Sequence, residues 1–507
     1  MGVHSQFIRR KGILYGSKAR LENVLTLLRR VAPLFALSLL ACAGRAPAPQ
    51  PPTATPGPDA PTAMQPPAFV PLGADGGSGS QAWHPGSPRN QIREAIFTGA
   101  WTAVRDKHFD KTLGGLDWDG LRRKYQPLAL AAPDEPTFYR LLNEMLGLLG
   151  QSHLQVHGPG EEPGPPPDEI ASPQARTAAA DAIREAGDDY GDPGLLVRII
   201  EGKPTITRVR PGSSAAGAGL RPGFLVTHIG GRALASLPPS GRALRPVEER
   251  FRLRQLAARR LAGPVGSRVS LRCLDENDRP IEVMLERDPP PARAIQVLNM
   301  SPVVPEVASR QSGEVGILAF NVFLLQPVLG EVQKAIDGFR ARGAKAIIID
   351  LRGNPGGIGA MVIPLAARLS TAPLTLGTIV YRDFSNTLAT TASLGIKPFA
   401  GRVVILTDEG SASTSEIFAA GLQEAKRAFV VGDTTAGAAL GSIIEGLPGG
   451  AVVQIPVADF RTPKGMTIEG RGVQPDHRVW ETRAGFLAGR DVVLDAGLDL
   501  AKASHPQ

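Results

Sequence analysis

One stretch of this 507-residue chain leaves little freedom in its local structure: Val403 to Phe418, which reads VVILTDEGSASTSEIF. Residues Val403–Leu406 have the length and β-branching of a buried strand, and Asp408–Ser411 are typical of a turn. After the turn, Ile417 and Ala420 continue the apolar pattern at helical spacing. The stretch therefore predicts a strand, a tight turn and a helix in immediate succession.

Three serines, Ser411, Ser413 and Ser415, lie in or beside that turn. The first turn of a helix has backbone N–H groups without acceptors, and the helix dipole adds partial positive charge there. An anion that forms in front of the helix is therefore stabilised. Serine is also an ordinary N-cap residue, and this segment alone does not choose among the three serines or between the two roles.

Charge and cysteine content exclude several classes of function. The formal net charge is +8, but residues 1–41 contain seven Lys or Arg and one Glu, so only +2 remains for the rest and no nucleic-acid partner is expected. Cys42 and Cys273 are the only cysteines, too few for a cysteine-based metal site. No His, Cys and Asp cluster has ligand spacing, so we expect no metal and no cofactor.

Residues 1–41 have the pattern of an export signal, because positive charges precede Val31–Ala41, an apolar run too short to span a bilayer. The run ends in LLAC, which resembles the lipobox of bacterial lipoproteins. That resemblance implies that Cys42 becomes the lipid-modified first residue of an exported protein on the periplasmic face of a membrane. An ordinary cleaved signal is the alternative. Residues 42–88, with ten prolines between Pro47 and Pro71, predict an extended tether.

Residues 89–157 are predicted to form an N-terminal helical domain. Three segments, which begin near Asn90, Asp117 and Asp134, have apolar residues at helical spacing. The third segment ends in GQSH, at Ser152 and His153, and is followed by the strand-like LQVHG.

Two further folded regions follow. Residues 158–190 are rich in Pro and Ala and predict a flexible crossing. Residues 191–288 have short alternating strands and one helix near Glu248–Leu261, which is typical of a small β-rich module. Residues 289–485 alternate strands with helices and predict a layered α/β domain. Residues 486–507 are expected to form a C-terminal tail.

Within the α/β region, the apolar strand Ala346–Ile349 runs into the glycine-rich turn DLRGNPGG, Asp350 to Gly357. Glycines at such a place allow backbone N–H groups to approach a ligand closely. A single turn of this kind is weak evidence of function by itself.

These segments together resemble the C-terminal processing, or tail-specific, proteases and the tricorn branch of that family. The run SASTSEIFAAGLQEAKRAFVVGDTTAG is similar to the family's S-A-S-x-S-E-I motif and the strand after it, in which the nucleophile is the serine at Ser413. The glycine-rich turn resembles the family's D-x-R-x-N-x-G-G motif. The resemblance implies a ClpP/crotonase-like catalytic fold and an oxyanion hole formed by the amide of Gly356 or Gly357 together with that of Thr414.

The general base is where the chain departs from the processing-protease branch. That branch uses a lysine at the position that Ala438 occupies here, and no lysine lies between Lys426 and Lys464. A serine hydroxyl needs a base, usually one that a third group orients. The segment LLNEMLGLLGQSHLQV is similar to the helix of the tricorn branch that ends in Ser-His. That resemblance implies His153 as the base, Ser152 as its support and Glu469, in TIEGRGV, as the orienting carboxylate.

Alternatives remain open for two of these roles. His157 is the local competitor of His153, and Lys464 is the runner-up base. Glu424 is a less convincing candidate for the carboxylate, and a structural hydrogen bond in a glycine-bounded turn is the alternative role of Glu469. The sequence alone does not decide among them.

The 191–288 module resembles a PDZ domain through PGSSAAGAGLRPG, with Phe224 where that family usually has Asp. The resemblance implies a loop whose amides bind a peptide's C-terminal carboxylate, formed by Gly194, Leu195, Leu196 and Val197, while the peptide adds a strand to the sheet edge. A module that only packs against and gates the catalytic domain is the alternative.

The resulting hypothesis is a multidomain α/β serine endopeptidase that cleaves unfolded or C-terminally exposed polypeptides through a Ser413, His153 and Glu469 acyl-enzyme mechanism. Its partners are polypeptide substrates and, through the lipid anchor, a membrane. A non-catalytic peptide-binding scaffold and a serine hydrolase of non-peptide esters are the alternative functions.

Overall fold

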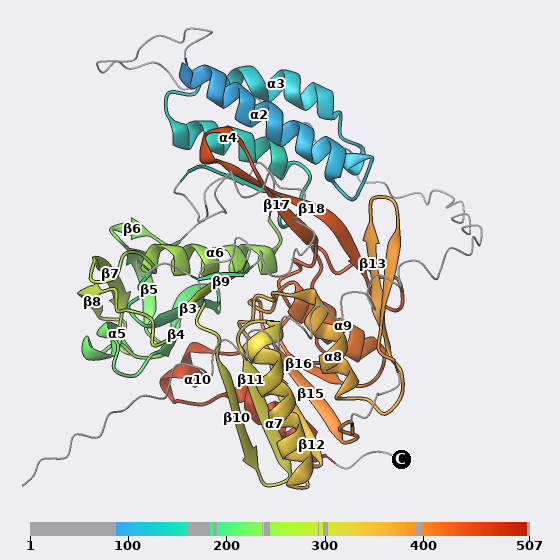
Figure 1. Cartoon of the computed structure of the whole chain (residues 1–507). Coiled ribbons are helices and arrows are strands. Elements are labelled where there is room, and N and C mark those ends of the chain that lie inside the picture. Colours follow the sequence, from blue (N-terminus) through green and yellow to red (C-terminus); the bar gives the residue numbers. More distant parts are fainter. Residues whose placement is uncertain are drawn as a thin grey trace, which may run out of the picture. The chain divides into compact units, whose positions relative to one another are not determined.

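The computed structural model describes residues 88–159, 183–185, 190–235, 237, 244–292, 294–297, 303–391 and 397–503. Within these ranges the chain has a mixed α/β fold (Figure 1). The export signal, Cys42 and almost all of the tether and the crossing lie outside the described residues, so those predictions stay predictions. No helix in the described ranges combines the length and the apolar character that crossing a membrane requires.

The first described elements are three helices, α2 (Pro88–Lys107), α3 (Trp118–Leu130) and α4 (Glu135–Gly147). Asp117 and Asp134 are the N-caps of α3 and α4, and each side chain accepts a hydrogen bond from the amide three residues further on. The apolar faces of the helices share one core cluster, to which Phe97, Phe138 and Leu142 belong.

The same cluster includes residues of a five-stranded antiparallel sheet. Its strands are β1 (Gln155–His157), β13 (Thr375–Tyr381), β14 (Ser385–Ala389), β17 (Gly441–Gly446) and β18 (Val452–Arg461). β1 pairs with β18, with Gln155 opposite Gln454 and His157 opposite Val452. This pairing fixes the segment that follows α4 against a strand almost 300 residues later in the chain.

Residues 191–288 contain a six-stranded sheet in the order β3-β4-β5-β7-β8, with β6 beside β5. The strands are β3 (Leu195–Ile200), β4 (Lys203–Val209), β5 (Leu225–Ile229), β6 (Arg232–Ala233), β7 (Arg268–Leu274) and β8 (Pro280–Glu286). The described residues of this module also form two helices, α5 (Ser214–Gly217) and α6 (Pro246–Leu261), and α6 contacts β3, which is an edge strand of the described sheet. A two-stranded sheet of β2 (Ile183–Glu185) and β9 (Ile295–Val297) lies outside this sheet.

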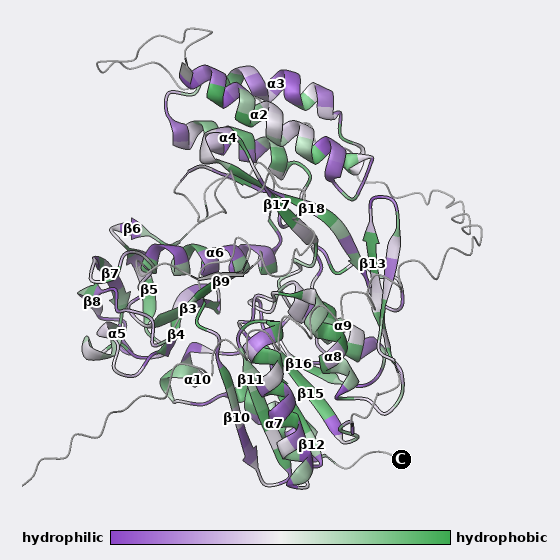
Figure 2. Cartoon of the chain, viewed as in Figure 1, coloured by the Kyte–Doolittle hydropathy of each residue, from purple (hydrophilic) through white to green (hydrophobic). Residues whose placement is uncertain are grey.

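The largest core surrounds a second six-stranded sheet, in the order β10-β11-β12-β15-β16-β19. The strands are β10 (Val307–Ser312), β11 (Val315–Phe320), β12 (Ala346–Asp350), β15 (Arg402–Thr407), β16 (Phe429–Gly432) and β19 (His477–Arg478). Only the β10–β11 pair is antiparallel. β11 and β15 are coloured as hydrophobic along most of their length in Figure 2, as expected for strands that are covered on both faces.

Helices cover both faces of this sheet. α7 (Gly330–Ala341), α8 (Val362–Ala367) and α9 (Thr414–Glu424) share a core with Ile347 and Ile349 of β12. On the opposite face, Ile348 belongs to a different cluster together with Val493 of α11 (Val492–Lys502). The alternation of successive β12 residues between the two clusters follows from the period of two in a strand.

The range 486–507, expected as a C-terminal tail, contains helices in its described part. α10 (Arg483–Leu487) extends into this range, and α11 packs on the main sheet against Val404 and Leu406 of β15. The side chain of Asp491 caps α11 by accepting a hydrogen bond from the amide of Leu494. A sheet that is apolar on both faces needs helices packed on both, and α11 packs on the face opposite α7, α8 and α9.

Candidate active site

The turn between β15 and α9 holds the candidate nucleophile. Ser413 is the N-cap of α9 and has φ 52° and ψ −118°. Positive φ is uncommon for a residue other than glycine and marks backbone strain, which concentrates at functional sites. A serine on such a strand-to-helix turn has the setting of a nucleophile elbow, in which the hydroxyl is presented in front of the helix.

The hydrogen bonds distinguish the three serines of this turn. Ser411 Oγ donates to the carbonyl of Leu351 at 2.8 Å, and Ser415 Oγ donates to the carbonyl of Asn354 at 2.9 Å. Both side chains are fully buried and serve to join the nucleophile turn to the glycine-rich turn. Ser413 is the serine whose position suits attack on a substrate.

Two backbone amides beside Ser413 have no acceptor among the described residues: those of Gly357 and Thr414. The amide of Gly356 instead donates to Asn354 Oδ1 at 2.9 Å. A Cβ atom at Gly356 would lie 2.8 Å from both Ser413 Cβ and the Thr414 nitrogen, so only glycine fits there. Of the two candidate glycines, Gly357 therefore has the amide that is available to an oxyanion.

The candidate base belongs to a chain of hydrogen bonds that begins at Glu469. Ser152 Oγ donates to Glu469 Oε2 at 2.9 Å, and the same Oγ lies 2.7 Å from His153 Nδ1. Because the hydroxyl proton is directed at Glu469, Nδ1 must be the donor to Ser152 Oγ, which leaves Nε2 unprotonated. Glu469 thus orients the imidazole through Ser152 and makes no direct hydrogen bond with His153 within the described residues.

Backbone amides hold the same carboxylate. Glu469 Oε1 accepts from the Ser152 amide at 2.7 Å, and Oε2 accepts from the Ala439 amide at 2.9 Å. His153 itself has φ 57°, so it is a second strained non-glycine residue at this site.

One peptide segment links this chain to the nucleophile. The Ala438 carbonyl accepts from the Ser413 amide at 2.9 Å, and the next residue, Ala439, donates to Glu469. The Ser413 amide and the Glu469 carboxylate are therefore bound by adjacent residues, Ala438 and Ala439. No hydrogen bond joins Ser413 Oγ to His153 Nε2 in the described part of the chain; such contacts often form only with substrate bound.

Burial governs the protonation of these groups. It lowers the pKa of His153 to about 4, so the imidazole is neutral at physiological pH. It raises the pKa of Glu469 to about 7, although the donors from Ser152 and Ala439 oppose that shift. A neutral base beside a carboxyl that titrates near neutrality is the kind of pair found at acid–base sites.

The competing candidates are placed differently. Lys464 is exposed, and its amide donates to Glu424 Oε2 at 2.8 Å, so these two residues form a contact of their own. His157 is buried on β1, and its Nε2 has no hydrogen-bond partner in the described residues. Burial also lowers the pKa of His157 to about 4.

Glu416, which the sequence did not single out, is a structural centre of the nucleophile turn. It is fully buried, and its carboxylate accepts from the amides of Ser413, Gly437 and Ala438, at 3.0, 2.7 and 2.9 Å, and from the Thr435 hydroxyl. Burial raises the pKa of Glu416 to about 7. The signal that could have identified it is the S-x-x-E spacing of a capping box, Ser413 to Glu416.

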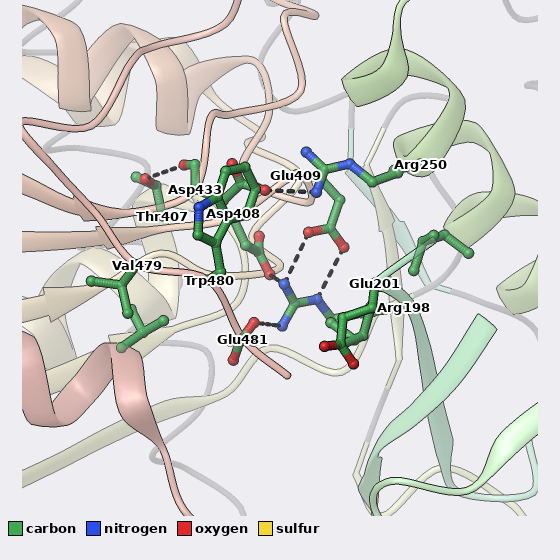
Figure 3. Close-up of a pocket in the computed structure, with 13 residues that line it drawn as sticks. Arg198, Glu201, Arg250, Thr407, Asp408, Glu409, Asp433, Val479, Trp480 and Glu481 are labelled. Atoms are coloured by element: carbon green, nitrogen blue, oxygen red, sulfur yellow. Dashed lines mark hydrogen bonds and ion pairs between the residues drawn. The ribbon is translucent and has the colours of Figure 1, made fainter. Parts of the chain in front are cut away.

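The β-rich module contacts the nucleophile turn directly (Figure 3). Arg198 of β3 donates to both carboxylate oxygens of Glu409, at 3.0 and 2.9 Å, and to Glu481 at 2.5 Å. Arg250 of α6 donates to Asp433 at 2.7 Å. These arginines were not predicted, because a single arginine in a β-rich segment carries no local pattern.

The predicted carboxylate-binding loop begins at Gly194, which has φ 80°. Its amide donates to Asp192 Oδ1 at 2.6 Å. Leu195, Leu196 and Val197 open β3, which pairs with β4 and with no other strand among the described residues. No group of three or more His, Cys, Asp or Glu side chains in the described ranges is arranged to hold a metal ion.

Comparison with known proteins adds the family. Residues 314–479 match the model of peptidase family S41, and residues 89–147 match that of the tricorn protease C1 domain. A carboxyl-terminal-processing protease of Synechocystis sp. is 28% identical over 80% of this chain and 86% of the relative. These matches support a serine peptidase of the C-terminal processing family.

Other relatives of the peptidase extend this picture. A putative tricorn protease homolog 2 of Streptomyces coelicolor is 29% identical over 85% of the chain, which corresponds to 34% of that longer protein. Among solved structures, mature CPAF complexed with lactacystin has a TM-score of 0.57 at 16% identity and covers 82% of the peptidase and 98% of the CPAF chain. At that identity the likeness supports the fold alone.

Proposed function

We propose that this serine peptidase uses Ser413 as nucleophile, His153 as general acid and base, and Glu469, acting through Ser152, as the group that orients the imidazole. The observation that carries the proposal is the hydrogen-bonded chain from Glu469 Oε2 through Ser152 Oγ to His153 Nδ1, next to the segment that binds the Ser413 amide. The order His153, Ser413, Glu469 along the chain differs from the orders of the chymotrypsin, subtilisin and α/β-hydrolase triads, but such constellations are recognised by geometry and roles.

In the proposed reaction, Ser413 Oγ attacks the carbonyl carbon of the scissile peptide and His153 Nε2 takes its proton. The amides of Gly357 and Thr414 hold the oxyanion, and each such donor contributes about 3 kcal/mol in enzymes of this type. His153 then protonates the leaving amine, which leaves an acyl group on Ser413. A water molecule, deprotonated by His153, releases the acid product.

The proposed substrates are unfolded or C-terminally exposed polypeptides. Two relatives bear the name carboxyl-terminal-processing protease, and β3 is an edge strand to which an extended peptide can add. On this proposal the 191–288 module is a PDZ-like domain that binds substrate through Gly194–Val197, and the main α/β domain is ClpP/crotonase-like.

The test of this function is turnover of unfolded casein by the wild type and by Ser413→Ala. We expect the substitution to remove turnover, because the acyl-enzyme cannot form, without changing the melting temperature by more than a few degrees. Unchanged turnover by S413A would exclude the proposed mechanism. Hydrolysis of small esters without any cleavage of casein would instead favour a hydrolase of non-peptide esters.

We further propose that the enzyme is exported and held at the periplasmic face of a bacterial membrane by a lipid on Cys42. The support is the charged segment and apolar run that precede Cys42 in the sequence. Radiolabelled palmitate should label the wild type and not Cys42→Ser. Equal labelling of both proteins would contradict the anchor.

A further inference from the structure

α6 makes contacts inside and outside its own module. Leu253, Ala257 and Leu261, at intervals of four residues, are buried in the module. Nearer the N-terminal end of the helix, Arg250, Phe251 and Arg254 reach segments of the catalytic domain. Figure 2 shows the helix largely in the hydrophilic colour, so its contacts outside the module depend on arginine and on one aromatic ring.

Arg254 lies between the two turns that form the candidate oxyanion site. Its Nη2 donates to the carbonyl of Gly353 at 3.2 Å. A Cβ atom at Gly353 would lie 2.6 Å from Nη2, and a Cβ at Gly410 would lie 1.4 Å from Nη1. The guanidinium therefore fills a cradle that exists only because both positions are glycine.

The cradle connects the two amides that face the oxyanion. Gly353 lies in the glycine-rich turn that ends at Gly357, and Gly410 precedes Ser413 and Thr414 by a few residues. Asp408 joins the same two glycines from another side, because its Oδ1 accepts from the Gly353 amide at 2.7 Å and from the Gly410 amide at 2.8 Å. Arg254 and Asp408 thus hold the two turns at one separation.

The weak pairing of Arg254 Nη1 argues against a purely stabilising role. This atom is buried and has no hydrogen-bond acceptor among the described residues, and its ion pair with Asp408 Oδ2 is long, at 3.8 Å. A buried donor without an acceptor costs stability. Retention of this cation despite its cost in stability is consistent with a role in positioning the two turns.

Two other side chains of the β-rich module also contact the nucleophile turn. Phe251 packs against the apolar cluster of Ala412, Ala436 and Ala438. Ala412 precedes Ser413 in the sequence, and the Ala438 carbonyl accepts a hydrogen bond from the Ser413 amide. Arg198 holds Glu409 with two hydrogen bonds. The position of the nucleophile turn is therefore set partly from outside the catalytic domain.

We propose that Arg254, a residue of the β-rich module, is a positioning residue for the oxyanion site: it sets the separation between the turn of Gly357 and the turn of Thr414. This deepens the proposed function and rests on it. Displacements of about 1 Å in a reacting site can cost a hundredfold in rate, so loss of the guanidinium slows acylation. We expect substrate affinity to be unaffected, because the guanidinium contacts the turns at Gly353 and Gly410 and not the predicted carboxylate-binding loop.

The test compares Arg254→Ala, Arg254→Lys and the matched control Gln255→Ala in the full chain. Gln255 is the next residue of α6 and is exposed. Casein turnover gives kcat and KM, and the second-order rate of fluorophosphonate labelling reports acylation directly. We expect R254A to lower kcat and the labelling rate together by roughly tenfold to a hundredfold, with KM within twofold, R254K to be intermediate and Q255A to match the wild type.

A double-mutant cycle of Arg254→Ala with Gly410→Ala tests whether Arg254 acts through its contact with Gly410. G410A alone should slow labelling, because its Cβ expels the guanidinium, whereas R254A/G410A should be no slower than R254A. Multiplicative losses, a normal labelling rate in R254A, or a raised KM at unchanged kcat would each overturn the proposal. If R254A does not fold, G410A and R254K still decide it. Ser413→Ala, assayed in parallel, separates failure of this claim from failure of the proposed function.

Discussion

At the scale of single residues, the proposed mechanism depends on one proton position. Ser152 Oγ has a single proton, and the hydrogen bond to Glu469 uses it. His153 Nδ1 must then donate to Ser152, and Nε2 is free to accept the proton of Ser413. Ser152 is therefore as important to the tautomer of the base as the carboxylate behind it.

The pH profile of kcat/KM follows from the pKa of Glu469. Burial raises that pKa to about 7, so the carboxyl is protonated below this pH and gives no charge to stabilise the imidazolium that forms in the reaction. Activity should rise with pH through about 7 and then level off. Glu469→Gln should be slower by at least about tenfold, less than the roughly hundredfold minimum expected for loss of the acid or base itself, and its profile should lack this limb. A limb that persists unchanged in E469Q would assign the titration to another group.

Individual residues could be predicted where they lie in a short sequence motif, but not where their role depends on distant parts of the chain. Ser413, Ser152, His153 and Glu469 each lie in a short motif, so sequence was sufficient to name them as candidates. Arg198 and Arg254 lie in no motif, and they acquire meaning only from carboxylates and glycines in distant parts of the chain. The choice of Gly357 over Gly356 also required coordinates, because it depends on which amide Asn354 occupies.

At the scale of elements, α11 shows how much the main sheet depends on a helix at the end of the chain. Val493 is 2% exposed and packs in the same cluster as Ile348, Val404 and Leu406. An aspartate at this position would be a buried charge without a partner, which costs several kcal/mol.

Val493→Asp should therefore lower the free energy of unfolding by about 3 kcal/mol or more. Asp495→Ala, at an exposed position on the same helix, serves as the control and should change it by less than about 0.5 kcal/mol. Chemical denaturation of both variants checks this expectation. Equal stability of V493D and the wild type would mean that α11 does not seal the sheet.

Elements with a strong internal pattern were predictable and the others were not. β12 begins at Ala346, where its apolar run predicted the strand, and α6 begins within two residues of the predicted helix. β13, β14, β17 and β18 were not predicted, because an antiparallel strand that packs on one face takes its register from its partners. Yet this sheet is what fixes β1, and with it the segment of His153.

At the scale of the whole molecule, the candidate active site is assembled from segments that are far apart in the sequence. His153 follows the N-terminal helices, Gly357 follows β12, Ser413 precedes α9 and Glu469 lies after β18. The β-rich module adds Arg198, Arg250 and Arg254. The mixed α/β class could be predicted from the alternation of strands and helices, whereas the contacts among modules could not, since they join residues without local signals.

The most direct test of this account is the rate at which a fluorophosphonate labels Ser413 in the wild type, in His153→Ala and in Lys464→Ala. General base catalysis contributes about 10²- to 10⁴-fold, so H153A should label at least a hundredfold more slowly, and K464A should label at the wild-type rate. Labelling of H153A at the wild-type rate, or its loss in K464A alone, would contradict a histidine from the N-terminal helices as the base.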